Sequence, residues 1–252
     1  MRTITLGVSF KQYLDIPSTV AWARAAAAVA REHPVVRSGA VRLFMLPSLP
    51  AVSAVRNVIS DAPISIGAQD LHWADRGPYT GGVSGVDLVE LGCRYVEVGH
   101  AERRTVFGED AEVTRRKFAA ALRNGLAPVL CVGERDEVDA ETAAGVCIAQ
   151  LESAFAAADH VGVREIVVAY EPEWAIGRAE PARPEHVAFV ASAISEALQQ
   201  EPWLRPSVVY GGSAKPGTLT ALGGAVDGLF LGRFAHRVED FARIIDEAAA
   251  VA

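Results

Sequence analysis

The sequence predicts an α/β fold, a single (β/α)8 barrel formed by residues 1–252. Short apolar runs rich in β-branched residues alternate with longer stretches rich in Ala, Glu and Arg, and eight such units follow one another at fairly even spacing. The strand runs are apolar almost throughout, as is typical of a parallel sheet covered on both faces. A length of 252 residues also fits one such barrel. An open, doubly wound sheet is the alternative, and periodicity alone does not exclude it.

The expected elements follow directly from this pattern. We expect strands at residues 3–9, 41–46, 64–68, 95–98, 128–132, 165–170, 207–210 and 228–231. The expected helices include residues 19–31, 113–124, 140–158, 184–200 and 238–250. No linker rich in Pro or Ser divides the chain, so one domain is predicted.

The amino-acid composition argues against several classes of function. The net charge is −7 with both signs interleaved, which does not suit a nucleic-acid-binding face. Apolar runs are far shorter than the roughly 20 residues of a membrane span. The three cysteines are widely spaced and match no metal-ligand pattern. We therefore expect reduced, buried thiols in a cytoplasmic protein, with no metal, membrane or nucleic-acid partner.

In a barrel, chemistry gathers where the strands end. The first expected strand ends before Lys11, one of only three lysines, whose compact ammonium group could hold an anion. The fourth ends before His100, where a helical turn begins and a neutral imidazole is favoured. A solvated lysine and a structural histidine are the simpler interpretations of each residue taken alone.

The sixth expected strand ends directly before Glu171, a candidate general base because partial burial would raise its pKa. The next residues form a largely apolar loop that we interpret as a lid over the site, made of Pro172, Trp174, Ala175 and Ile176. Pro172 and Gly177 at its two ends would be the hinges. A capping Glu beside a packed loop is the alternative. The last two expected strands are followed by Gly211-Gly212-Ser213 and Gly232-Arg233, a pattern that suits a phosphate-binding loop.

Together these residues suit removal of a proton next to a carbonyl, with a lid that keeps water out. At this point the sequence resembles the triosephosphate isomerase family over essentially its whole length. The segments that carry the resemblance are 67–69, 79–81, 99–104, 130–134, 170–177, 210–213 and 226–228. The family is also the source of a standard example of acid–base tuning in a barrel, so those pKa expectations are not independent of the resemblance.

The resemblance implies a role for each residue. Glu171 would be the base, His100 the neutral electrophile and Lys11 the positive charge beside the phosphate and enediolate. Glu102 would be a partner of Lys11. Substrate and phosphate would be bound by Ser9, Gly177, Ser213, Gly232 and Arg233. The family is a cofactor-free homodimer, so the loop around Thr80 would reach the neighbouring subunit, and the ligand would be a small phosphorylated sugar.

Several positions depart from the usual family pattern. Ser9 stands where Asn is usual, and Arg233 where a second Gly is usual. The other departures are Ala101, Gly82, Glu173, Arg178 and Ala179. The residues that would contact the substrate therefore differ from the usual family pattern, whereas the proton-transfer residues Glu171, His100 and Lys11 are all present. This resembles the branch that interconverts L-erythrulose 1-phosphate and D-erythrulose 4-phosphate, which we favour slightly over triosephosphate isomerase proper. A phosphate-binding lyase or synthase, or a non-catalytic sugar-phosphate-binding barrel, are remoter alternatives.

Overall fold

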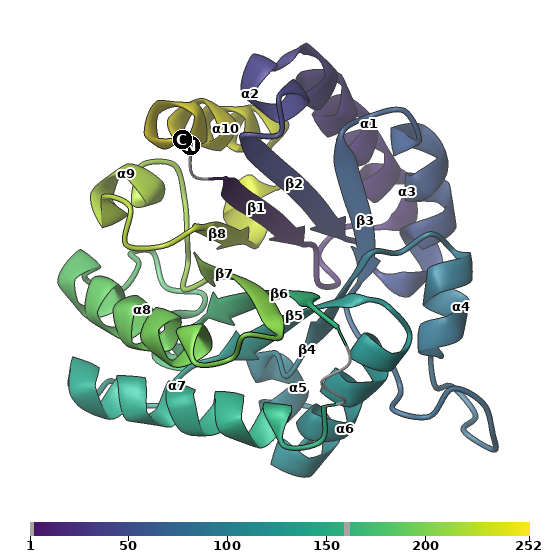
Figure 1. Cartoon of the computed structure of the whole chain (residues 1–252). Helices are drawn as coiled ribbons and strands as arrows, with labels where there is room; N and C mark the ends of the chain where they lie inside the picture. The colour runs from purple at the N-terminus through teal and green to yellow at the C-terminus, as the bar shows by residue number, and fades with distance from the viewer. Residues whose placement is uncertain (1–2, 159–161) are drawn as a thin grey trace.

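The computed structural model describes residues 3–158 and 162–252, and in it eight parallel strands close into a barrel (Figure 1). The strands follow the chain order around the barrel, and β8 pairs with β1. They are β1 (Ile4–Ser9), β2 (Val41–Leu46), β3 (Ile64–Ala68), β4 (Tyr95–Val98), β5 (Ala127–Val132), β6 (Arg164–Tyr170), β7 (Leu204–Tyr210) and β8 (Gly228–Leu231). The closed barrel confirms the predicted fold and rules out the open sheet.

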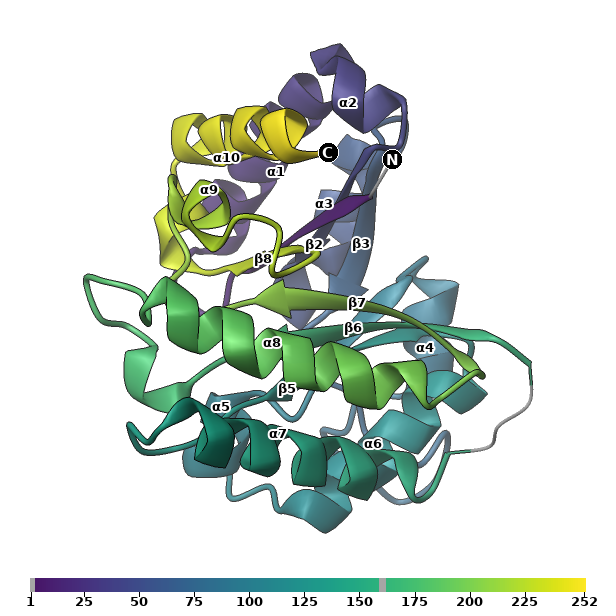
Figure 2. The same cartoon turned by 60° about the vertical axis from the view of Figure 1, so that its left-hand side comes forward.

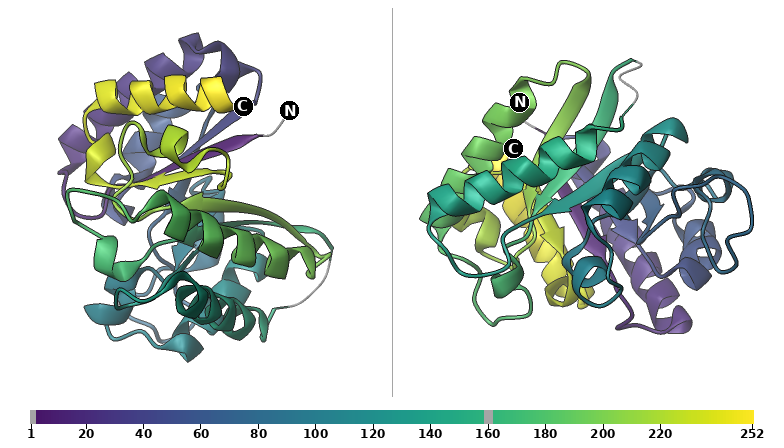
Figure 3. Two further views of the ribbon diagram at one scale, coloured as in Figure 1. Left: turned by 90° about the vertical axis from the view of Figure 1, so that its left-hand side faces the viewer. Right: turned by 90° about the horizontal axis from the view of Figure 1, so that it is seen from below.

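Helices form the outer layer (Figure 3). They are α1 (Ile16–Glu32), α2 (Pro34–Arg37), α3 (Val52–Ile59), α4 (Gly85–Glu90), α5 (Ala101–Thr105), α6 (Ala111–Arg123), α7 (Ala140–Phe155), α8 (Pro184–Gln199), α9 (Thr218–Leu222) and α10 (Val238–Val251). Three short 3₁₀ helices are η1 (Leu49–Ala51), η2 (Glu173–Ala175) and η3 (Arg233–Ala235). Helices α7 and α8 lie side by side over the strands β5 to β7 (Figure 2). In the described part of the chain, no helix combines the length and apolar character that a membrane span requires.

Strand boundaries agree closely with the sequence pattern. Four strands begin and end where expected, and β7 differs most, beginning at Leu204 rather than Ser207. The cause is Arg205-Pro206, a pair that does not look like a strand. The structure nevertheless pairs Pro206 with Ile166 of β6. This start of β7 is partly exposed, so a polar pair is tolerated there.

The core has two layers because the strands are buried on both faces. One apolar cluster fills the space between strands and helices. A second lies inside the barrel and contains Phe44, Leu46, Tyr95, Ala127, Val129, Cys131, Val167, Ala169, Val209 and Phe230. Strand residues alternate between these two layers, so the inward side of each strand is fixed by its sequence.

The barrel closes where β8 meets β1, and this contact requires a glycine. Gly228 has φ +154°, and a Cβ there would lie 1.7 Å from the carbonyl oxygen of Thr5. Any side chain would push the two strands apart. Closure matters for function because it brings the end of β1 beside the ends of β7 and β8.

Candidate active site

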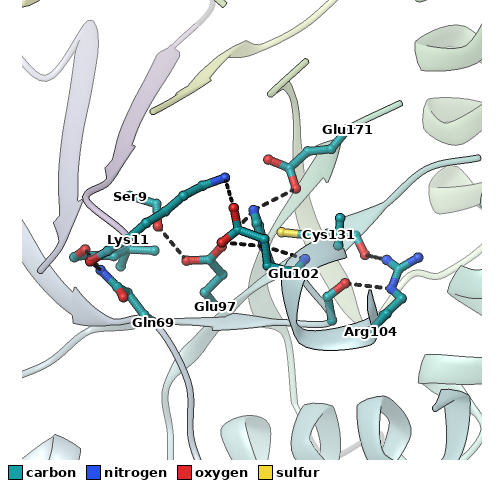
Figure 4. A network of polar contacts seen from close by, with 12 residues as sticks. Ser9, Lys11, Gln69, Glu97, Glu102, Arg104, Cys131 and Glu171 are labelled. Atoms are coloured by element: carbon teal, nitrogen blue, oxygen red, sulfur yellow. Dashed lines mark hydrogen bonds and ion pairs between the residues drawn. The ribbon is translucent and has the colours of Figure 1, made fainter. Parts of the chain in front are cut away.

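Side chains from distant parts of the sequence meet in one cavity of about 250 Å³ at the carboxyl end of the barrel. Lys11 follows β1, His100 follows β4 and Glu171 follows β6. Figure 4 shows the side chains of Lys11 and Glu171 directed toward the same space. The cavity is also lined by Ser9, Glu102, Ile176, Gly177, Ser213, Gly232 and Arg233.

Glu171 is held at the end of β6 by its backbone. Its N–H donates to the carbonyl of Val132 at 2.8 Å, so strand pairing continues up to this residue. Gly211 packs so closely that a Cβ there would be 2.7 Å from Cγ of Glu171. Burial raises the pKa of Glu171 to about 7, although the nearby Lys11 charge opposes the rise. The carboxyl group can therefore both take and return a proton near neutral pH.

His100 faces this carboxylate as a neutral imidazole. The N–H of Glu102 donates to Nδ1 of His100 at 3.1 Å, so the proton of the neutral ring is on Nε2. Nε2 lies 3.6 Å from Oε2 of Glu171. Burial lowers the pKa of His100 to about 3, helped by the charges of Lys11 and Arg104. The short helix α5 contributes its first N–H groups, but burial is the main reason that the ring stays uncharged.

Lys11 brings a positive charge to the cavity. Its Nζ donates to Oε1 of Glu102 at 2.7 Å, and its backbone has φ +50°, which is unusual for a residue with a side chain. The amide of Gln69 donates to the Lys11 carbonyl at 3.0 Å and fixes this turn. Burial alone would lower the pKa of Lys11. The hydrogen bond to Glu102 and the charges of Glu171, Glu102 and Glu97 outweigh burial and raise it.

The lid, residues 172–177, lies against the barrel end and contributes Ile176 and Gly177 to the cavity lining. Trp174 Nε1 donates to Oε1 of Glu134 at 2.7 Å. The hydroxyl of Ser213, a residue with φ +57°, donates to the carbonyl of Ala175 at 2.8 Å. These bonds join the lid to the loops after β5 and β7.

Arg233 also contacts the lid. Its Nη2 donates to the carbonyl of Gly177 at 2.6 Å, so it bridges the end of β8 and the lid. Glu173, a departure from the family pattern, lies 3.3 Å from Arg104 Nη1. Thr80 lies on the exposed loop between β3 and α4 and does not line this cavity.

A buried carboxyl group beside these residues was not predicted from the sequence. Glu97 is on β4 and only 3% exposed, and the hydroxyl of Ser9 donates to its Oε2 at 2.9 Å (Figure 4). Burial raises the pKa of Glu97 to about 8, and the charge of Glu171 adds to the rise. An acidic residue within the apolar run of residues 95–98 was the available signal.

Within residues 3–158 and 162–252, no group of three or more His, Cys, Asp or Glu side chains is arranged to hold a metal ion. Cys93, Cys131 and Cys147 are free and buried, as expected.

The titration of Glu97 predicts a pH-dependent effect of its replacement. The raised pKa means that the folded state holds the proton more tightly than the unfolded chain, where Glu titrates near about 4.3. Wild-type stability should therefore fall from about pH 4.5 to about pH 8 because of this group. Relative to wild type, Glu97→Gln should gain unfolding free energy on the order of 1–3 kcal/mol between pH 5 and pH 8, measured by urea denaturation.

Glu165→Gln is the control for this measurement. Burial would raise the pKa of Glu165, but hydrogen bonds from Arg94 and Tyr95 lower it instead. The Glu165 carboxyl group is therefore ionised at both pH 5 and pH 8. The difference in unfolding free energy between Glu165→Gln and wild type should then be the same at these two pH values. An offset for Glu97→Gln that is equally independent of pH would show that Glu97 is not protonated in the folded protein.

Comparison with known proteins agrees with this geometry. The family model of triosephosphate isomerase matches residues 4–248. An L-erythrulose-1-phosphate isomerase of Pectobacterium atrosepticum is 47% identical over 249 residues, covering 98% of this chain and 96% of the relative. Another from Rhizobium etli is 36% identical, covering 98% and 93%. A triosephosphate isomerase of Moorella thermoacetica is 38% identical over 221 residues, covering 85% and 88%. The chain is therefore an isomerase that belongs to the triosephosphate isomerase family.

Proposed function

We propose that the protein interconverts L-erythrulose 1-phosphate and D-erythrulose 4-phosphate through an enediolate. The observation that carries this proposal is the meeting of Glu171, His100 and Lys11 in one small cavity. A base, a neutral hydrogen-bond donor and a cation are the groups that carbonyl migration between adjacent carbons needs. We assign the catalytic roles to these three residues.

The reaction begins when the Glu171 carboxylate takes the proton from the hydroxyl-bearing carbon next to the carbonyl. The carbonyl oxygen gains negative charge, which the Nε2–H of His100 and the ammonium group of Lys11 stabilise. The hydroxyl proton moves to the former carbonyl oxygen. Glu171 then returns its proton to the former carbonyl carbon, so the carbonyl has moved by one position and no atoms are gained or lost.

We assign phosphate binding to the part of the cavity formed by the lid and the loops after β7 and β8. Gly177, Ser213 and Gly232 line it there, and Arg233 brings a guanidinium group to the same edge. Ile176 and the rest of the lid would exclude water from the enediolate, which otherwise loses phosphate by elimination. Glu102 positions Lys11 through their 2.7 Å ion pair.

Two observations favour the four-carbon substrate over a triose phosphate. Relatives named L-erythrulose-1-phosphate isomerase align with 97–98% of this chain, and the triosephosphate isomerases compared with it align with 81–85%. In addition, Ser9 is short and its hydroxyl is directed to Glu97, which leaves room beside the reacting carbons. Triosephosphate isomerase activity is the second candidate, because relatives of that name reach 39% identity.

A direct comparison of substrates tests the proposal. We expect purified protein to have a kcat/KM for L-erythrulose 1-phosphate at least about tenfold above that for dihydroxyacetone phosphate, because the site accommodates the larger sugar. Both constants can be measured with coupled assays under the same conditions. A preference for the three-carbon substrate would instead assign the protein to triosephosphate isomerase activity.

We also propose that the protein is a cytoplasmic homodimer. A second cavity of about 600 Å³ adjoins the first, and its rim carries exposed apolar side chains: Leu49 (39% exposed), Val106 (72%) and Phe107 (60%). The loop around Thr80 projects away from the barrel (Figure 1). Insertion of this loop from a second copy would cover the apolar rim. The free, buried thiols suit a reducing compartment.

The oligomeric state can be measured by sedimentation equilibrium at micromolar concentration. We expect a mass twice the 26.7 kDa of one chain. Phe107→Asp should shift the protein toward monomer, because it places a charge in the covered rim. Phe189→Asp on α8, at an exposed position (51%), is the matched control and should remain dimeric. A monomeric wild-type protein with full activity would refute the dimer.

A further inference from the structure

Glu97 occupies a position where an apolar side chain would be expected. It lies two residues after Tyr95 on β4, so both side chains point into the barrel. The inward-facing residues of that region form an apolar cluster that includes Phe44, Leu46 and Cys131. Burial of a carboxyl group among such residues costs free energy unless it is well paired. A polar residue at this place therefore requires an explanation.

Glu165 on β6 carries a carboxyl group that contacts the inward-facing Tyr95, and it is paired in a way that Glu97 is not. Glu165 accepts hydrogen bonds from Arg42 at 2.7 Å and from Tyr95 at 2.9 Å, and it forms an ion pair with Arg94. These contacts connect β2, β4 and β6 at the amino end of the barrel. Glu97 has no Lys or Arg within 4.0 Å among the described residues, so the same structural role does not account for it.

The partners of Glu97 leave one oxygen available. Oε2 is bound to the Ser9 hydroxyl at 2.9 Å. Oε1 is 3.8 Å from Nε2 of His100, which is beyond hydrogen-bonding distance. Because burial raises the pKa of Glu97 to about 8, the group is mainly protonated at neutral pH. It can then both donate and accept a hydrogen bond without bringing a second negative charge beside Glu171.

Glu97 also lies on the side of the site away from the phosphate-binding residues. Gly177, Ser213, Gly232 and Arg233 line only the 250 Å³ cavity, whereas Glu97 lines only the adjoining 600 Å³ cavity. The two cavities share Ser9, Lys11, His100 and Glu102. A substrate that spans the catalytic residues with its phosphate in the first cavity therefore has its other end directed toward Ser9 and Glu97.

The chemistry of the two candidate substrates differs at that end. Both carry phosphate on the carbon next to the carbonyl, and both lose a proton from the carbon on its other side. The tetrulose bears one extra hydroxymethyl group on this reacting carbon. Discrimination between the substrates thus depends on what binds one additional hydroxyl group, and a site with a matched polar partner discriminates far better than an apolar wall.

We propose that Glu97, oriented by Ser9, binds the terminal hydroxyl group of the four-carbon substrate and selects it over the triose phosphate. The inference rests on the proposed function, since it explains a preference for the tetrulose. Glu97 acts as a binding residue for a group that does not react, and the proton-transfer set of Glu171, His100 and Lys11 is separate from it. The carboxyl group replaces water as the hydrogen-bonding partner of that hydroxyl.

The test compares Glu97→Met with Glu97→Gln, using the ratio of kcat/KM for L-erythrulose 1-phosphate to that for dihydroxyacetone phosphate. Met has a similar length but cannot pair with a hydroxyl group, whereas Gln keeps a donor and an acceptor. We expect Glu97→Met to lower the ratio at least about tenfold and Glu97→Gln to change it less than about threefold. Glu165→Gln, at the far end of the barrel, is the control and should leave the ratio unchanged.

The outcomes separate this inference from the proposed function. A wild-type protein without a tetrulose preference refutes the proposed function, whatever the variants do. A wild-type preference that survives in folded Glu97→Met refutes the role of Glu97 and leaves the proposed function standing. If Glu97→Met does not fold, Ser9→Ala decides, because it removes the hydroxyl that orients the carboxyl group. A ratio lowered at least about threefold in Ser9→Ala supports the inference, and an unchanged ratio refutes it.

Discussion

The exclusion of water from the Glu171 carboxylate is the constraint on which the rest of the site depends. Burial brings the pKa of this group to about 7, and the same burial keeps the neighbouring His100 uncharged. Burial opposes the charge of Lys11, and the ion pair with Glu102 helps to keep this residue protonated. Burial therefore gives a base and a neutral donor, and the ion pair with Glu102 keeps a cation in the same small space.

The barrel makes this arrangement possible because its backbone needs no help from the active-site side chains. Strand pairing satisfies the polar groups of the main chain, and the apolar interior and the Glu165 network hold the amino end together. The carboxyl end is thus free to carry groups that destabilise the fold. Glu97 and Glu171 are both buried there with raised pKa values, a cost that a purely structural protein would have no reason to bear.

The sequence was sufficient for the barrel and for the side chains at its rim. Buried strands are read from apolar runs, and residues such as Lys11 and Glu171 are conspicuous because they directly follow such runs. Short helices such as α5 and α9 lack a long periodic pattern, and Pro206 made the predicted strand shorter than β7 is in the structure. Glu97 was missed because its importance depends on contacts with Ser9 and His100, which are distant or indirect in the sequence. The hydrogen bond from Arg233 to Gly177 likewise joins residues that are far apart in the sequence, so it is seen only in the folded structure.

The most direct test of the account is solvent isotope incorporation during isomerisation of L-erythrulose 1-phosphate in D₂O, followed by NMR. Proton transfer through Glu171 predicts deuterium at the carbons that exchange the carbonyl. It also predicts incorporation slowed by at least about a hundredfold in a folded Glu171→Asp variant, whose carboxylate is withdrawn from the substrate. Isomerisation over many turnovers without deuterium, or undiminished incorporation by Glu171→Asp, would contradict the account.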